Sequence, residues 1–162
     1  MSGFADTDRI ARVELVEDRP RARTPAIQQE LDVAIHDLTE ENAFRPAIEG
    51  APPGPYTLRI GMAGKLLALE IATGDGSAAQ TLQLSISPLR PVIKDYFAIC
   101  ESYFDAVKRL PPDRIEAIDM GRRGIHDEGA RLLSERLEGR VETDHPTARR
   151  LFTVICALQY RG

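Results

Sequence analysis

The sequence has few cysteines, no long apolar run and no diagnostic catalytic motif. Its 162 residues include two cysteines, Cys100 and Cys156, and neither has a second cysteine or a histidine nearby at the spacing of a metal site. Both lie in apolar helical surroundings, which predicts reduced core thiols in a cytoplasmic protein rather than a disulfide. No apolar run could span a bilayer, so we expect no membrane contact. The first twelve residues, MSGFADTDRIAR, show no secretory signal.

Basic residues are slightly outnumbered by acidic ones. The chain has 21 Lys and Arg against 25 Asp and Glu, a formal net charge of −4. This balance disfavours non-specific binding to DNA or RNA, which requires a basic surface. A contact with RNA or DNA through a local basic patch is still compatible with this charge. The affinity of such a contact must fall as the salt concentration rises. Its candidate residues are Arg21, Arg23, Arg45 and the Arg122–Arg123 pair.

Apolar periodicity predicts an α+β fold. Alternating apolar residues predict strands near residues 10–16, 56–62, 66–71 and 81–86. Helical apolar spacing predicts helices near residues 25–42, 88–110, 112–138 and 146–158. The order β-α-β-β-β-α-α-α is typical of an antiparallel sheet of about four strands with helices packed on one face. We expect the first strand at an edge of the three-stranded meander.

The length favours one domain, residues 1–162. A chain of this size buries roughly 70% of its unfolded surface, enough for a core without staples. We expect residues 1–8 and 43–55 to be flexible, because the second segment holds four prolines and two glycines and is predicted to be an irregular loop. The last helix is apolar over a wide face. It is either a core helix or half of a homodimer interface, and the core role is the commoner one.

One segment, residues 112–139, interrupts a helical apolar stripe with ionisable residues. Pro112 suits the first helical position and Gly139 suits the position after the last turn. Arg122 falls inside the stripe, and Asp119 and His126 fall on its edge, three and four residues away, so the three can touch. A charge that faces a core must be paired, hydrogen-bonded or hydrated. The segment therefore predicts a polar cluster beside apolar neighbours.

Three glycines bear on this prediction. Gly121, Gly124 and Gly129 lie inside the segment, and each costs a helix interior about 1 kcal/mol relative to alanine. A break between residues 121 and 124 would change the phase of the stripe and separate the cluster. We favour one continuous helix, in which the glycines allow another backbone to approach closely.

The cluster has a functional and a structural interpretation. As an anion or phosphate site, Arg122 and Arg123 would supply charge, His126 a proton, and Asp119 and Glu128 acid–base or orienting groups. As a structural feature, it would be a satisfied set of ion pairs that fixes helix packing or a dimer contact. We favour the structural interpretation, because ion-pair networks perturb pKa values without being functional sites.

Several uninterrupted runs carry a resemblance to a known family. They are IKDYF (93–97), ICESY (99–103), IEAIDMGRRG (115–124), His126, EG (128–129), ERLEG (135–139), TARRLFT (147–153) and, less strictly, IHDL (35–38) and the closing RG (161–162). Over most of the chain beyond Ala26 the sequence resembles uncharacterised protein family 0262, a family of small bacterial proteins. That family has no assigned substrate, cofactor or catalytic residue. The resemblance therefore implies a bacterial, cytoplasmic protein and no particular reaction.

Two functional hypotheses follow. The first is a non-enzymatic binding or protein-interaction module, with a protein partner or as a homodimer built on the last two helices, because no nucleophile–base pair and no metal-ligand set is visible. The alternative is an enzyme or sensor for an anionic, phosphorylated metabolite that uses Asp119, Arg122, Arg123 and His126. We lean away from an enzyme and expect neither a cofactor nor a metal. Ligand, partner and oligomeric state are not predicted.

Overall fold

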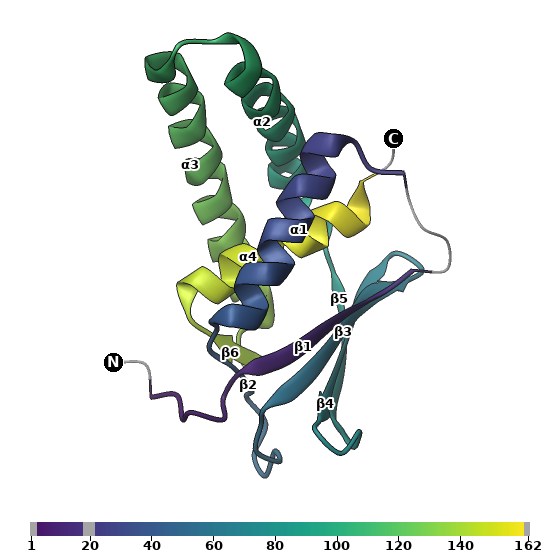
Figure 1. Ribbon diagram of the computed structural model, residues 1–162. Coiled ribbons are helices and arrows are strands. Elements are labelled where there is room, and N and C mark those ends of the chain that lie inside the picture. Colours follow the sequence, from purple (N-terminus) through teal and green to yellow (C-terminus); the bar gives the residue numbers. More distant parts are fainter. Residues whose placement is uncertain (1–2, 18–21, 161–162) are drawn as a thin grey trace.

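A layer of helices covers one face of a four-stranded sheet in the computed structural model, which describes residues 3–17 and 22–160 (Figure 1). The predicted α+β class, with helices on one face, is confirmed. The elements in chain order are β1 (Ile10–Val16), α1 (Pro25–Glu40), β2 (Phe44–Pro46), β3 (Tyr56–Ala63), β4 (Leu66–Thr73), β5 (Ala78–Ser85), the 3-10 turn η1 (Ser87–Leu89), α2 (Arg90–Arg109), α3 (Pro112–Leu137), β6 (Val141–Thr143) and α4 (His145–Gln159).

The main sheet has the strand order β1-β3-β4-β5. Strands β3, β4 and β5 form the predicted antiparallel meander, and β1 lies at its edge as expected. The sheet is nevertheless mixed, because β1 runs parallel to β3, with Val13 opposite Leu58 and Leu15 opposite Ile60. The prediction of a purely antiparallel sheet was wrong. Helix α1 lies between β1 and β3 in the chain and supplies the crossover that a parallel pair requires.

A second, two-stranded sheet joins β2 to β6. The segment 43–55, predicted as an irregular loop, therefore contains a strand, and this part of the prediction was wrong. Arg45 in β2 pairs with Glu142 in β6 at 2.8 Å. This pairing joins the chain between α1 and β3 to the strand that follows α3. The expected flexibility of residues 1–8 and 43–55 stays a prediction. Strands of three residues are too short to show an alternating pattern.

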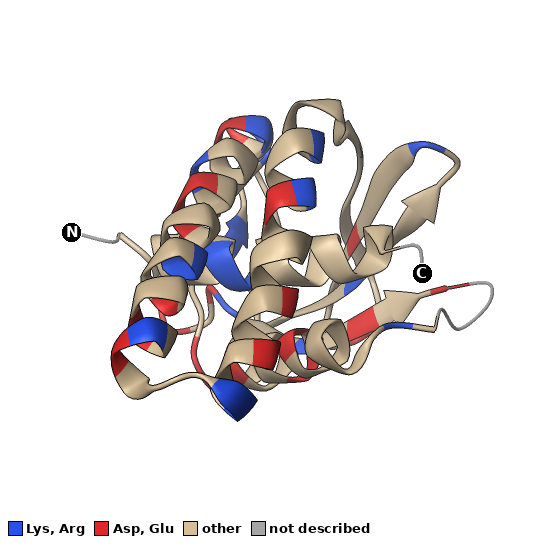
Figure 2. Ribbon diagram, turned by 90° about the horizontal axis from the view of Figure 1, so that it is seen from above, with Lys and Arg blue, Asp and Glu red and all other residues tan. Residues whose placement is uncertain are grey.

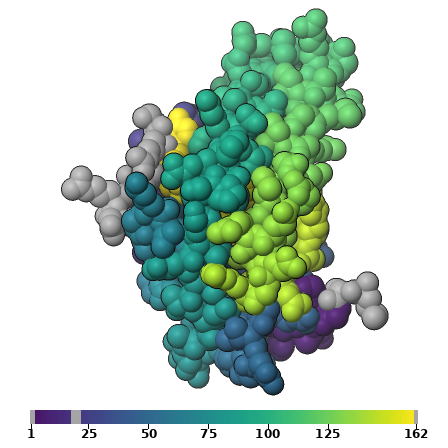
Figure 3. Space-filling view, turned by 180° about the vertical axis from the view of Figure 1, so that it is seen from behind, coloured from purple at the N-terminus to yellow at the C-terminus, as the bar shows by residue number. Residues whose placement is uncertain are grey.

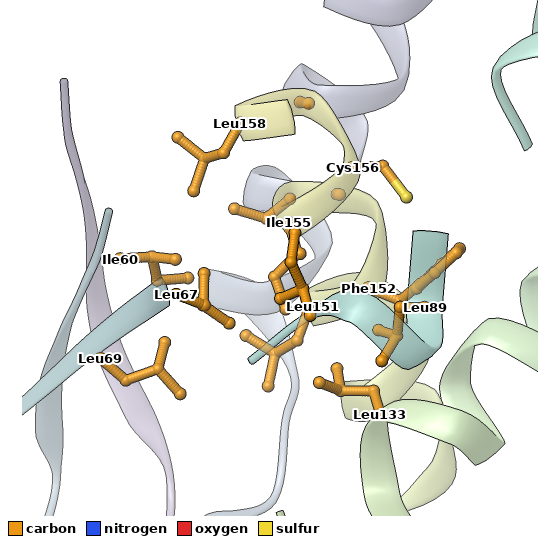
Figure 4. Packing of buried hydrophobic residues seen from close by; sticks show 14 of the residues in the cluster. Ile60, Leu67, Leu69, Leu89, Leu133, Leu151, Phe152, Ile155, Cys156 and Leu158 are labelled. Atoms are coloured by element: carbon orange, nitrogen blue, oxygen red, sulfur yellow. The ribbon is translucent and has the colours of Figure 1, made fainter. Parts of the chain in front are cut away.

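Helix α4 is the central element of the core. All eight residues from 151 to 158 are buried. In Figure 4, Leu151 and Ile155 point toward the sheet residues Ile60 and Leu67, and Phe152 lies on the side of Leu133 in α3. The core role expected for this helix is confirmed, and the homodimer stays a prediction. Its central position places the one polar side chain of this run, Thr153, at the meeting point of the helices.

Helices α2 and α3 form a long hairpin that projects beyond the rest of the molecule (Figures 1 and 3). Helix α3 is continuous over 26 residues, so its interior glycines do not break it. Helix α2 begins two residues later than predicted, because Ser87 to Leu89 form a 3-10 turn first. The continuity of α3 keeps residues 119, 122 and 126 on one side of the helix, as the candidate site requires.

Candidate functional site

Arg122 on α3 lies between carboxylates from two helices. Its Nη1 is 3.1 Å from Glu30 Oε1 on α1, and its Nη2 is 2.8 Å from Asp119 Oδ1 on α3. The three side chains are only 15–19% exposed. Burial is the largest influence on the pKa of Arg122 and would lower it, but Glu30 and then Asp119 outweigh burial and raise the pKa. The guanidinium is therefore a permanent cation, and it also lies 4.7 Å over the ring of Tyr103.

A chain of hydrogen bonds continues from Glu30 across the helices. The Tyr96 hydroxyl on α2 donates to Glu30 Oε1 and lies 3.5 Å from Thr153 Oγ1 on α4. The same Thr153 oxygen is 2.6 Å from His126 Nε2 on α3. Four helices thus meet in one set of contacts. We call this set the polar network: Glu30, Tyr96, Asp119, Arg122, His126 and Thr153.

Two proton arrangements fit the contact between His126 and Thr153. If Thr153 donates its single hydroxyl proton to the Arg149 carbonyl at 3.2 Å, His126 Nε2 donates to Thr153 Oγ1; if Thr153 donates to Nε2, that nitrogen is the acceptor. Tyr96 donates to Glu30, which accepts as a carboxylate. A neutral His126 carries its proton on Nε2 in the first arrangement and on Nδ1 in the second.

Burial accounts for the neutral state of His126. Desolvation lowers its pKa from 6.5 to about 4, and the positive charges of Arg149 and Arg122 act in the same direction against the opposing effect of Glu30. The imidazole packs on the Tyr96 ring with 4.8 Å between centroids and on the edge of Phe152 at 6.4 Å. At neutral pH the ring is therefore a hydrogen-bonding group and not a cation.

The polar network opens onto a cleft of about 350 Å³ between α1, α3 and α4, which we call the arginine cleft. Four arginines, two carboxylates and one histidine contribute to its lining. The lining residues are Gln29, Glu30, Val33, Ala34, Asp37, Tyr103, Arg122, Arg123, His126, Pro146, Arg149, Arg150 and Thr153. With His126 neutral, the lining residues alone carry two more positive than negative charges. Asp119 and Asp127, which pair with Arg122, Arg123 and Arg149 from outside the lining, balance these charges.

The arginines of the cleft differ in how fully they are paired. Arg123 contacts Asp119 Oδ2 at 2.9 Å with a side chain that is 66% exposed, and Arg150 donates to the Glu41 carbonyl at 2.7 Å. Arg149 Nε lies 3.3 Å from Asp127 Oδ1, an ion-pair distance. This contact lacks hydrogen-bond geometry, and the buried Nε has no hydrogen-bond acceptor in residues 3–17 and 22–160. The Arg149 side chain is nevertheless 36% exposed, so a ligand in the cleft can contact other atoms of this residue but not the buried Nε.

Four of the five sequence-predicted residues lie in or beside the site. Arg122, Arg123 and His126 line the arginine cleft. Asp119 is not part of the lining but forms ion pairs with both arginines. Glu128 lies elsewhere: its exposed side chain pairs with Arg131 on the outer face of α3.

The sequence argument did not connect Glu30, Thr153 or Arg149 with the site, and it favoured plain core packing for Tyr96. A signal for Glu30 was present, because it lies three residues after Ile27 and four before Ala34 on the buried side of α1. The other three residues look like ordinary members of apolar or basic helices in the sequence.

Other reactive groups of the chain are shielded. Desolvation raises the pKa of the Cys100 thiol to about 12 and that of Cys156 well above its ordinary value, so neither buried thiol is a ready nucleophile. The described part of the chain holds no group of three His, Cys, Asp or Glu side chains arranged to bind a metal ion. None of the helices in that part combines the length and the apolar character needed to cross a membrane.

The fold and site define a class: an α+β protein in which a polar network at the junction of four helices faces a cleft lined by four arginines. Within that class, the chain belongs to the uncharacterised protein family UPF0262, whose family model matches residues 7–161. The resemblance inferred from the sequence is thereby confirmed.

Curated relatives cover nearly the whole chain. The UPF0262 protein of Jannaschia sp. (strain CCS1) is 56% identical over 151 residues, which are 93% of this chain and 97% of the relative. That of Paracoccus denitrificans (strain Pd 1222) is 54% identical over 154 residues, 93% and 95% of the two chains. That of Rhodopseudomonas palustris (strain BisB5) is 52% identical over 155 residues, 96% and 94%. No solved structure matches the chain.

Proposed function

We propose that this bacterial protein is a non-enzymatic binding module whose arginine cleft binds a small anionic ligand. The observation that carries the proposal is Arg149: it lines the cleft, its side chain is 36% exposed, and its ion-pair partner among the described residues is Asp127. The Nε atom is itself buried, so a ligand would contact the terminal nitrogens of the guanidinium. An anionic oxygen there would add a charge-assisted hydrogen bond to a cation that Asp127 contacts only at ion-pair distance.

The surroundings of Arg149 suit a carboxylate or phosphate. Arg123 and Arg150 line the same cleft, and guanidinium groups bind such anions through two parallel hydrogen bonds. Arg122 is already held by Glu30 and Asp119. We therefore assign it a positioning role, in which it fixes the cleft wall and stacks on Tyr103.

Catalysis is the second candidate, and one observation favours it. His126 is a neutral imidazole in the lining of the cleft, and a neutral imidazole can accept a proton from a bound ligand. An enzyme acting on a phosphorylated metabolite would use Arg122, Arg123 and His126 in this way, with Asp119 behind them. Binding is the stronger proposal, because Thr153, the hydroxyl beside His126, is only 3% exposed and lies 3.2 Å from a backbone carbonyl oxygen.

Calorimetric titration with inorganic phosphate and with a panel of phosphorylated metabolites tests the proposal. The Arg149→Gln variant should weaken binding about tenfold or more, the worth of a charge-assisted hydrogen bond. Arg131→Gln is the matched control, because Arg131 pairs with acids on the outer face of α3 and does not line the cleft. Equal affinity in wild type and Arg149→Gln, or no binding by any anion, would refute the proposal. Release of product from a bound metabolite would move the assignment to an enzyme.

Location and assembly belong to the same proposal. A cytoplasmic location is supported by two free, buried thiols. A homodimer would have to use α3 rather than α4, because α4 is buried within its own chain. Sedimentation at micromolar concentration tests this state, and a monomeric profile would remove it.

Nucleic acid is not part of the proposal. Arg23 and Arg45 are already paired with Glu17 and with Asp8 and Glu142, and Arg21 lies outside the described residues. Figure 2 shows acidic and basic residues interspersed along the helices rather than gathered by sign. A titration with RNA and DNA at low salt tests this exclusion, which salt-sensitive binding would overturn.

A further inference from the structure

A second cavity adjoins the arginine cleft. It has a volume of about 220 Å³ and lies between α1 and α2. The two spaces share three lining residues, Gln29, Glu30 and Tyr103. The two spaces therefore lie next to each other on either side of these three side chains, and an extended ligand that passes over them would reach both.

The second cavity differs from the cleft in chemistry. Its remaining lining consists of Ala26, Cys100, Phe104, Val107 and one cation, Lys108. The Lys108 ammonium is placed over the Phe104 ring, 4.3 Å from the centroid. The carboxylate of Glu30 is taken up by Arg122 and Tyr96. The space therefore offers apolar surface to a ligand, next to a cleft that is lined by four arginines.

We propose that the ligand is a single-chain amphiphile, with a carboxylate or phosphate head group in the arginine cleft and an aliphatic chain in the second cavity. This inference rests on the proposed function, because it assigns the head group to the same arginines. It adds a chemical class: short- to medium-chain alkyl phosphates or carboxylates. Val107 supports it, since this residue lines the cavity and is 51% exposed, which leaves apolar surface for a chain to cover.

The test is a chain-length series. Calorimetry would compare inorganic phosphate with butyl, hexyl, octyl and decyl phosphate, each below its micelle concentration. Every methylene that enters the cavity should tighten the dissociation constant about two- to fourfold, and the gain should stop once the cavity is full. Octanol, which has no anionic head group, should bind much more weakly than octyl phosphate.

Two substitutions separate the cavity from a non-specific apolar surface. Val107→Asp places a carboxylate on the cavity wall and should abolish the chain-length gain while leaving inorganic phosphate binding unchanged. Met120→Asp makes the same kind of change at an apolar residue that is 65% exposed and lines neither space. It should leave the whole series unchanged.

The outcomes distinguish this inference from the proposed function. Phosphate binding that needs Arg149, with no gain along the alkyl series, would overturn the amphiphile and leave the anion site standing. A gain lost equally in Val107→Asp and Met120→Asp would also overturn it. Absence of binding by every phosphate in the series would overturn both.

Discussion

The ring of Phe152 on α4 packs directly against the backbone of Gly129 on α3. A β-carbon at position 129 would lie 2.4 Å from Phe152 Cζ, far inside van der Waals contact. A glycine inside a helix costs about 1 kcal/mol relative to alanine. At this position the missing side chain admits a buried aromatic ring, which in turn packs on Tyr96 and His126 of the polar network.

Gly129→Ala should therefore destabilise the protein, although alanine is the better helix former. Overpacking a core costs about 1–3 kcal/mol, more than the gain in helix propensity. Gly124→Ala on the same helix is the matched control, because nothing lies within 4 Å of a β-carbon there. It should stabilise by up to about 1 kcal/mol. Urea unfolding of both variants measures the difference, and equal shifts of the same sign would contradict the close packing.

Stability should fall as the pH is lowered from 7 to 4, in a step that belongs to His126. The unfolded imidazole takes up a proton near its ordinary pKa of 6.5, whereas the folded one does so only at about 4 because it is buried. Between these values the unfolded state binds more protons, so the free energy of unfolding decreases as pH falls. The loss between pH 7 and pH 5 should be about 2 kcal/mol.

The His126 step can be isolated by comparing two histidines. His126→Asn should remove the step from a series of urea unfolding curves at pH 7, 6 and 5. His36→Asn is the control, because His36 is exposed on α1, and it should keep the step. A step that persists in His126→Asn would assign it to another group.

The Glu30–Arg122 pair should be energetically coupled. Both side chains are less than one-fifth exposed, and a hydrogen bond to a charged group contributes about 1.5–3 kcal/mol. Glu30→Gln and Arg122→Gln should each destabilise by about that amount, and the double variant by clearly less than the sum, measured as a double-mutant cycle. The exposed Arg131–Glu135 pair should give a coupling below about 1 kcal/mol. Additive effects at Glu30 and Arg122 would show that the contact contributes nothing.

The sequence predicted elements wherever periodicity is long enough to assign a face. The alternation in β3, β4 and β5 identified the inward-facing residues. The apolar spacing of α3 predicted one continuous helix, and its interior glycines do not interrupt that helix. Alternation assigns a side chain to a face but carries no strand direction, so β1 was paired at the correct edge with the wrong orientation. The strands β2 and β6, with three residues each, have no period to detect.

The candidate site was predictable only along one helix. Asp119 pairs with Arg122, and Arg122 and His126 line the same cleft, because helical geometry places residues three and four apart on one side. The same geometry explains the misplaced Glu128, which is six residues from Arg122 and therefore about 240° around the helix. Glu30 and Thr153 reach the site from other helices, and no local pattern encodes a contact between helices.

Arg23 should be among the most sensitive charged residues of the chain. Its side chain, only 6% exposed, pairs with Glu17 after β1, and its Nε donates to the Ala157 carbonyl near the end of α4 at 3.0 Å. Removing one partner of a buried ion pair costs about 3–5 kcal/mol, because the other charge stays buried. Arg23→Met should lower the free energy of unfolding by about that amount in urea. Arg109→Met, which breaks an exposed pair with Asp105, should change it by less than about 1 kcal/mol.

The double variant Arg23→Met/Glu17→Met should regain part of the loss, since it leaves no unpaired carboxylate. A double variant as unstable as Arg23→Met alone would instead assign the loss to the contact with α4.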